Sequence, residues 1–326
     1  MTIHLETTVV SGRHVFLLLI EILGKILHLL VIAIAAAGPL LCIPLNAKQL
    51  NRKDTAARDS YWKLGTTLSR HSNIALILGS LLGLIVATLV WNDDFHQRCH
   101  ILKTRFMYAG IEWLFSFVLL LITHRWWLAR RDGFRSFLLR ALLIVLATTN
   151  LLYHFPILFM LVHEIPQSVV IKLESTGAEL SRSQFYEYAF SNNMLARWLH
   201  IVISMLMLSF AYVVVIALRF ARDVTDTARE TAVRAVNWAA RGVLVLLFAQ
   251  IGFGLMTLIT MENANLIMGG DVLATSLFGG SMCLLLLQLR QWTALTSRKI
   301  DPRAAAGAVT TLIALFSCMA AVSILS

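Results

Sequence analysis

Eight apolar runs dominate this chain, and each approaches or exceeds the roughly 20 residues that a helix needs to cross a bilayer. They lie near residues 15–44, 72–91, 106–128, 138–163, 198–218, 236–261, 271–289 and 304–325. Hydrophobic residues make up 58% of the 326 residues and charged residues only 14%, which excludes an ordinary soluble domain. Because backbone polar groups in hydrocarbon must be satisfied within the segment, these runs are predicted to be helices. We therefore predict an all-α, polytopic membrane helix bundle of about eight transmembrane helices in one domain, residues 1–326.

The positive charges alternate between the two sides of the predicted bundle. The connections 46–70, 123–140, 219–241 and 290–303 hold 6, 5, 5 and 4 Lys or Arg residues. The N-terminus to residue 14 and the connections 93–105, 165–197 and 262–270 hold 1, 3, 3 and 0. By the positive-inside rule the first set is cytoplasmic, and both termini are predicted to lie outside. The net charge of +10 is spread over four short loops rather than one basic face, so no nucleic-acid partner is expected.

The connections themselves predict little structure. The inner connection 46–70 is polar with mixed charge and is predicted to be a solvated loop. The outer connection 164–197 is the longest, and its stretch Ser181–Tyr188 is predicted to form a short surface helix. Gly79 and Gly83 form a G-x-x-x-G pattern in the second span, which lets another helix approach closely.

Four of the ionisable residues within the apolar runs are candidates for a functional site, because hydrocarbon tolerates such groups only for a reason. At 1.5 Å rise per residue, His28 lies roughly 20 Å along its span from the outside, and Glu112 roughly 9 Å along its own. His154 lies roughly 13 Å from the outer end of its span, and His200 only two residues into the fifth. All four are expected to line one cavity in the outer half of the bundle.

A metal or a haem would account for imidazoles at such depths, because coordination offsets the cost of burying them. The alternative is structural: a histidine in a membrane helix bonds a serine or a carbonyl on a neighbouring helix. For Glu112 the alternative is an ion pair with Lys25 or Arg197. The histidines at helix ends, His71, His124 and His163, are expected to be solvated.

The order and spacing of several residues resemble subunit I of the cytochrome bd quinol oxidases. The resemblance covers about residues 20–220 and rests on His28, Gly79, Gly83, Glu112, Asn150, Pro166 and His200. It implies that His28 is an axial ligand of a high-spin haem and that His200 ligates the low-spin haem b. His154 is a candidate cofactor-binding residue from its depth in the bundle alone. The resemblance also implies that Glu112 is a catalytic acid near the high-spin haem, where it serves in ligation or in proton delivery. The cofactors would be haem b and a second haem of the d type.

The chain also departs from that family. The family's second acidic residue, two turns after the first, is replaced by Leu120. The segment Met268–Val272 resembles the start of the quinol loop, but the Lys and Glu expected downstream are missing and the large loop is absent. The C-terminal segment with another haem-ligating glutamate is absent as well. Residues 221–326 are thus predicted to add three divergent spans to the conserved core.

Together these residues predict a haem-binding electron-transfer protein of the bacterial inner membrane, passing electrons from quinol or a periplasmic cytochrome c towards oxygen. An enzyme of this kind implies a second membrane subunit. The alternatives are a non-catalytic scaffold or assembly subunit of a respiratory complex and, less well supported, a transporter.

Overall fold

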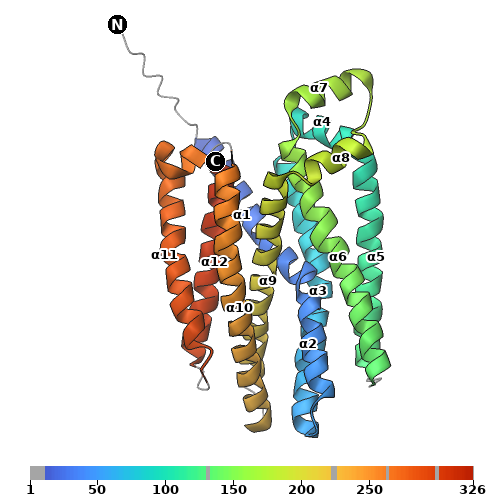
Figure 1. The fold of residues 1–326 in the computed structure, drawn as a ribbon, viewed down its shortest axis with the longest axis vertical. Coiled ribbons are helices and arrows are strands. Elements are labelled where there is room, and N and C mark those ends of the chain that lie inside the picture. Colours follow the sequence, from blue (N-terminus) through green and yellow to red (C-terminus); the bar gives the residue numbers. More distant parts are fainter. Residues whose placement is uncertain (1–11, 130–132, 222–225, 262–263, 298–300, 326) are drawn as a thin grey trace.

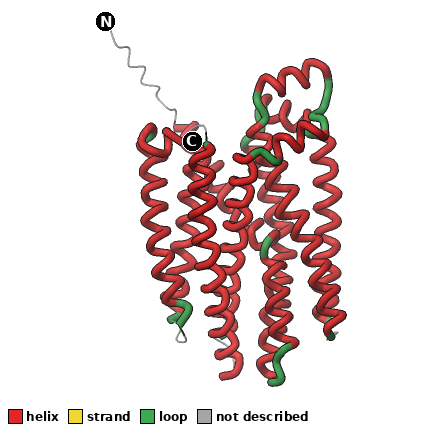
Figure 2. The backbone as a smooth tube through the Cα atoms, viewed as in Figure 1, coloured by secondary structure: helices red, strands yellow, loops and turns green. Residues whose placement is uncertain are grey.

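The protein is a bundle of helices that run side by side along one direction (Figures 1 and 2). The computed structural model describes residues 12–129, 133–221, 226–261, 264–297 and 301–325. Within these ranges the chain is helical apart from short connections and contains no strand, so the predicted all-α fold is confirmed.

Eight helical segments of the described chain are long and apolar enough to cross a membrane, which confirms the predicted number. The first consists of α1 and α2, and the others are α3, α5, α6, α9, α10, α11 and α12. Their bounds are Gly12–Ala36 (α1), Gly38–Leu50 (α2), Thr55–Leu89 (α3), Lys103–Leu128 (α5), Phe134–Glu164 (α6), Asn192–Phe220 (α9), Asp226–Thr260 (α10), Val272–Ala294 (α11) and Pro302–Leu325 (α12).

The first span is broken at Ala37, between α1 and α2. Pro39 explains the break, because its ring has no N–H to donate and clashes with the carbonyl one turn earlier. Hydroxyl groups of neighbouring helices bond to carbonyls at the break: Ser72 Oγ donates to Ile34 O at 3.0 Å, and Ser209 Oγ donates to Ala33 O at 3.0 Å. The irregular backbone is thus buried in protein, where it is tolerated at membrane depth.

Two spans extend well beyond their apolar runs on the inner side. Helix α3 begins at Thr55, where the Asp54 carboxylate accepts the Ala56 N–H, and α10 begins at Asp226. The prediction that 46–70 is a solvated loop is therefore wrong: all but a short turn of it is helix. Hydropathy marks the part of a helix in hydrocarbon, and strong helix formers such as Ala56 and Arg58 continue the helix beyond it.

Three short helices form a cap at one end of the bundle, the end where α1 begins and α12 ends (Figure 1). They are α4 (Asp93–Ile101), α7 (Gln167–Thr176) and α8 (Arg182–Ala189). The predicted surface helix at Ser181–Tyr188 is confirmed as α8, and a capping box between Ser181 and Gln184 begins it. Helices α2, α5, α9 and α11 all end at the opposite end of the bundle, as the alternating charges require (Figure 1).

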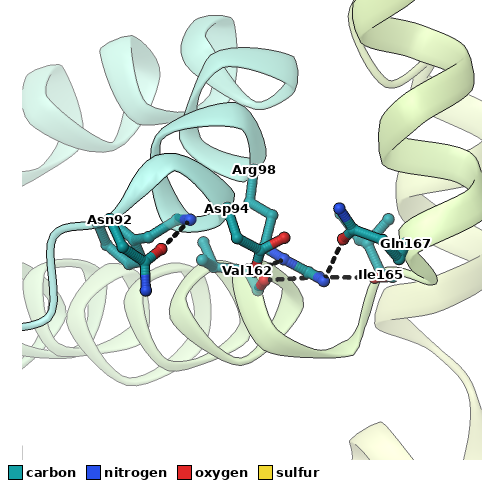
Figure 3. Close-up of polar contacts among 7 residues, drawn as sticks. Asn92, Asp94, Arg98, Val162, Ile165 and Gln167 are labelled. Carbon is teal, nitrogen blue, oxygen red and sulfur yellow. Dashed lines mark hydrogen bonds and ion pairs between the residues drawn. The ribbon is translucent and has the colours of Figure 1, made fainter.

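Arg98 fastens this cap to the spans (Figure 3). Its guanidinium donates to the Asp94 carboxylate at 2.7 Å, to the Ile165 carbonyl at 2.7 Å and to Gln167 Oε1 at 2.7 Å. It also donates to the Val162 carbonyl at 3.2 Å. These carbonyls lie at the end of α6, where helical backbone acceptors have no partner of their own. One side chain thus joins α4, the end of α6 and the start of α7.

Candidate functional site

An apolar cavity of about 290 Å³ lies between α1, α9, α10 and α12. Its walls are mostly aliphatic and aromatic, and four methionines line it: Met160, Met205, Met261 and Met319. The polar side chains on its walls are few and include His200, Ser204, Thr257 and Arg197. An apolar cavity with a few fixed polar groups is the usual form of a cofactor site.

His200 on α9 is held by a small network with α10. The Gln250 side-chain amide lies 2.9 Å from His200 Nε2 and donates to Ser204 Oγ at 2.7 Å. The Ser204 hydroxyl donates in turn to the His200 carbonyl at 2.8 Å, one turn earlier on the same helix. The ring is therefore fixed by two helices.

The other nitrogen of this ring, His200 Nδ1, is buried and has no hydrogen-bond partner. It lies on the side of the ring that faces Gly254, where a Cβ atom would be 3.4 Å from Nδ1 and 3.1 Å from Cε1. A buried polar atom without a partner costs about 1–3 kcal/mol. His200 as a residue also lines the apolar cavity, and histidine is the commonest ligand of metals and metal-bearing cofactors in proteins.

Arg197 lies one turn above His200 on α9 and also lines the cavity. Its guanidinium is paired with Glu164 at the end of α6. Arg197 is therefore not the partner of Glu112 that the sequence offered as an alternative. The charge of Arg197 at the cavity is therefore balanced by a carboxylate of the protein itself.

His28 lies at a different place, between α1 and α3. Its Nδ1 lies 2.8 Å from the carbonyl of Gly79, so Nδ1 carries the proton and donates. Gly83 lies against the ring, since a Cβ there would be 2.8 Å from His28 Cε1. The G-x-x-x-G pattern thus has the predicted packing role, with Gly79 against Ile32 and Gly83 against His28.

Glu112 on α5 pairs with His154 on α6, through a contact between the carboxylate and Nδ1. Lys25, the other partner that the sequence offered for Glu112, pairs instead with Glu21 at 2.6 Å. Two ionisable groups that were expected to act separately therefore form one pair. A carboxylate and an imidazole in contact can exchange a proton.

The expectation that His28, Glu112, His154 and His200 line one cavity is wrong for the apolar cavity, because His200 alone of the four lies on its wall. Helical rotation decides this: Ile26, Leu29 and Leu30 of α1 face the cavity, whereas His28 faces α3. Within the described residues no three or more His, Cys, Asp or Glu side chains are grouped to hold a metal ion. Histidines that lie apart could each ligate a cofactor that needs only one or two axial ligands from the protein, such as a haem.

Two histidines that were expected to be solvated have protein partners. His71 Nδ1 lies 2.9 Å from the Tyr212 hydroxyl, and His124 Nδ1 lies 3.2 Å from Ser69 Oγ. His163 is exposed, as expected, and lines a polar cavity of about 370 Å³ at the outer end of α1 and α3. His71 and His124 therefore contact hydroxyl groups on neighbouring helices, as a histidine with a structural role in a membrane span does.

Outside the spans, the electrostatics of the cap centre on Glu179. The Thr104 side chain and backbone N–H bond to this carboxylate and, with Lys103 at 3.5 Å, hold the pKa of Glu179 below its ordinary value. Burial raises the pKa of the Cys99 thiol in α4. Both effects favour the ordinary charge states at neutral pH, an ionised Glu179 and a neutral Cys99 thiol, so neither provides a reactive group.

The sequence did not single out three of the residues that hold His200: Ser204, Gln250 and Gly254. A weak signal was present. Ser204 follows His200 by four residues, and Gln250 and Gly254 are separated by four, which places each pair on one helical face. A glutamine in the middle of an apolar span is a further signal, since polar side chains there need a partner.

No protein-family model and no curated protein matches this chain. The cavity around His200 and the pairing of the other ionisable residues are therefore the observations on which a function rests.

Proposed function

We propose that this chain is a haem-binding membrane protein that transfers electrons, with His200 as an axial ligand of a b-type haem. One observation carries the proposal: His200 lies on the wall of an apolar cavity of about 290 Å³, and its buried Nδ1 has no partner. Apolar surroundings suit the macrocycle, and a neutral imidazole suits the iron. A b-type haem bound there would supply a one-electron carrier.

The walls of the cavity offer further groups that fit such a cofactor. The thioethers of Met205 and Met261 are on the wall and are candidates for a second axial ligand. Arg197 is paired with Glu164 through Nη1, and its remaining N–H groups would donate to a carboxylate of the macrocycle. Gly254 lets α10 pack closely against the His200 ring, since a Cβ there would lie 3.1 Å from Cε1.

His28 is proposed as the ligand of a second haem, of the b or d type. Its Nδ1 donates to the Gly79 carbonyl, which leaves the lone pair on Nε2. This is the usual state of a ligating histidine, whose second nitrogen is fixed by a backbone carbonyl. The Glu112–His154 pair is proposed to pass protons to that site, rather than His154 binding a cofactor.

The resemblance to subunit I of the bd oxidases extends the proposal to partners. A second membrane subunit, a quinol or cytochrome c donor and oxygen as the acceptor are what that resemblance implies. The bacterial inner membrane is the location that it implies.

A second candidate function is a membrane scaffold or assembly subunit without redox activity. The contacts of the ionisable residues favour this second function. Glu112 forms an ion pair with His154, and His28 is hydrogen-bonded to the Gly79 carbonyl. Groups that are satisfied by the protein need no cofactor to explain their burial.

Reduced-minus-oxidised spectra of the purified protein and its variants test the proposal. His200→Ala is expected to remove a low-spin haem signal, and His28→Ala a high-spin one. His71→Ala is the matched control, since His71 is another partly buried span histidine, and it should keep both signals. Spectra that are unchanged in both ligand variants would refute the ligand assignment, and a wild-type protein without haem bands would refute the haem proposal.

A further inference from the structure

Two histidines lie one turn apart on the exposed side of α4, in the cap. His96 and His100 are four residues apart, which places both rings on one side of the helix. Their ring centroids are 6.5 Å apart, and both residues are exposed. Two histidines at this spacing are the pair by which a helix holds a zinc ion in metalloproteases.

Glu174 of α7 holds the ring of His100. Its carboxylate Oε1 lies 2.7 Å from His100 Nδ1 and can only accept, so Nδ1 carries a proton and donates. In the neutral ring the lone pair is then on Nε2, and the side chain is 47% exposed, so a metal ion can reach it. Histidines that ligate metals commonly donate from their other nitrogen to a carboxylate in this way.

An ion pair with Glu174 accounts for His100 alone and leaves the second imidazole without a role. The His96 ring lies between His100 and Trp91, with its centroid 5.7 Å from that of the indole. A tetrahedral zinc about 2.0–2.1 Å from each ring nitrogen places the two centroids about 5 Å apart. Because exposed side chains change rotamer within nanoseconds, rotation of the His96 ring is enough to close this gap.

The charges around the pair favour a cation. The first turn of α4 carries Asp93 and Asp94, and Glu174 approaches from α7. Arg98, a cation of the same helix, is paired with Asp94 at 2.7 Å. Asp93 lies three residues before His96, and thus on the same side of the helix. A divalent ion at the histidines would therefore lie among carboxylates that attract it.

We propose that His96 and His100 form a binding site for a divalent transition-metal ion that imidazoles prefer, zinc or copper, with Glu174 as the positioning residue of His100. Water would complete the coordination, since no third His, Cys, Asp or Glu of the described chain is grouped with the pair. Because Glu174 belongs to α7, a metal on α4 would strengthen the contact between these two helices. The site lies in the cap, apart from the proposed haem sites, and neither proposal depends on the other.

Isothermal titration calorimetry with Zn²⁺ tests the site on the full chain, purified in detergent without a histidine tag. The wild type is expected to bind one ion at this site. His96→Ala and His100→Ala are each expected to weaken its affinity about 100-fold or more, because the loss of a ligand exceeds the 10–100-fold effect of losing a ligand's partner. Affinity that either variant leaves unchanged would overturn the site.

Two control variants locate the metal. His163→Ala removes another exposed histidine near the cap, which has Phe159 and Gln167 rather than histidines four residues away. Cys99→Ser removes the thiol beside His100, a competing metal ligand. Both should bind Zn²⁺ as tightly as the wild type. If Cys99→Ser loses the ion while the histidine variants keep it, the thiol is the ligand and the proposal is wrong.

The role of Glu174 has its own test. Glu174→Ala is expected to weaken Zn²⁺ affinity about 10-fold, and Glu174→Gln to recover part of it by restoring an acceptor for Nδ1–H. Amide hydrogen exchange gives a second readout: Zn²⁺ should slow exchange in α4 and α7 of the wild type, but only in α4 of Glu174→Ala. If Glu174→Ala binds as tightly as the wild type, the positioning role fails while the histidine site stands.

Discussion

At the residue scale, several ionisable groups in the spans pair with groups far away in the sequence. Glu112 meets His154 across 42 residues of sequence, and His28 meets the Gly79 carbonyl across 51. The depth estimates put Glu112 and His154 at similar levels, but pairing depends also on how α5 and α6 are rotated. Rotation comes from side-chain packing between helices, which a hydropathy pattern does not contain.

The contact between Gly83 and His28 gives a prediction at this scale. In Gly83→Ala the new Cβ would lie 2.8 Å from His28 Cε1, so the ring must shift away from the Gly79 carbonyl. We expect a loss of about 1–3 kcal/mol in unfolding free energy, the usual cost of overpacking. Thermal unfolding in detergent measures it. Gly110→Ala is the control, since nothing lies within 4 Å of a Cβ there, and equal melting temperatures for the two variants would contradict the account.

At the element scale, the spans were predictable and their ends were not. Eight apolar runs gave eight spans, because hydrocarbon permits no other fold for such segments. The break between α1 and α2 was missed, although Gly38 and Pro39 mark it. The inner ends of α3 and α10 were missed because polar residues can continue a helix in water. Helices α4 and α7 were missed because they are short and held by tertiary contacts, above all those of Arg98.

Arg98 gives the prediction for the cap. Lysine keeps the charge but cannot reach the Asp94, Ile165 and Gln167 acceptors with one planar fork. In Arg98→Lys we expect faster amide hydrogen exchange in α4 and α7, by about 10-fold or more, since a charged hydrogen bond contributes about 1.5–3 kcal/mol. Exchange in α9 and α10 is expected to stay unchanged. If the exchange rates of α4 and α7 in Arg98→Lys equal those of the wild type, Arg98 does not hold the cap.

At the scale of the whole molecule, the sequence predicted a multi-span bundle whose connections alternate between two ends, and the structure has that arrangement. What it could not predict is which side chains meet. Leu29 and Leu30 reach the cavity with His200, while His28, their neighbour, faces α3. The bundle therefore separates the four ionisable residues into three places, and each place has its own proposed role.

The haem content of the purified wild-type chain tests the central claim most directly. A pyridine haemochromogen assay on detergent-solubilised protein gives the number of haems per chain, and His200→Ala measures the share that the cavity holds. The account predicts at least one b-type haem per wild-type chain and its loss in His200→Ala. A folded wild-type chain without haem, or a haem content that His200→Ala leaves unchanged, would contradict it.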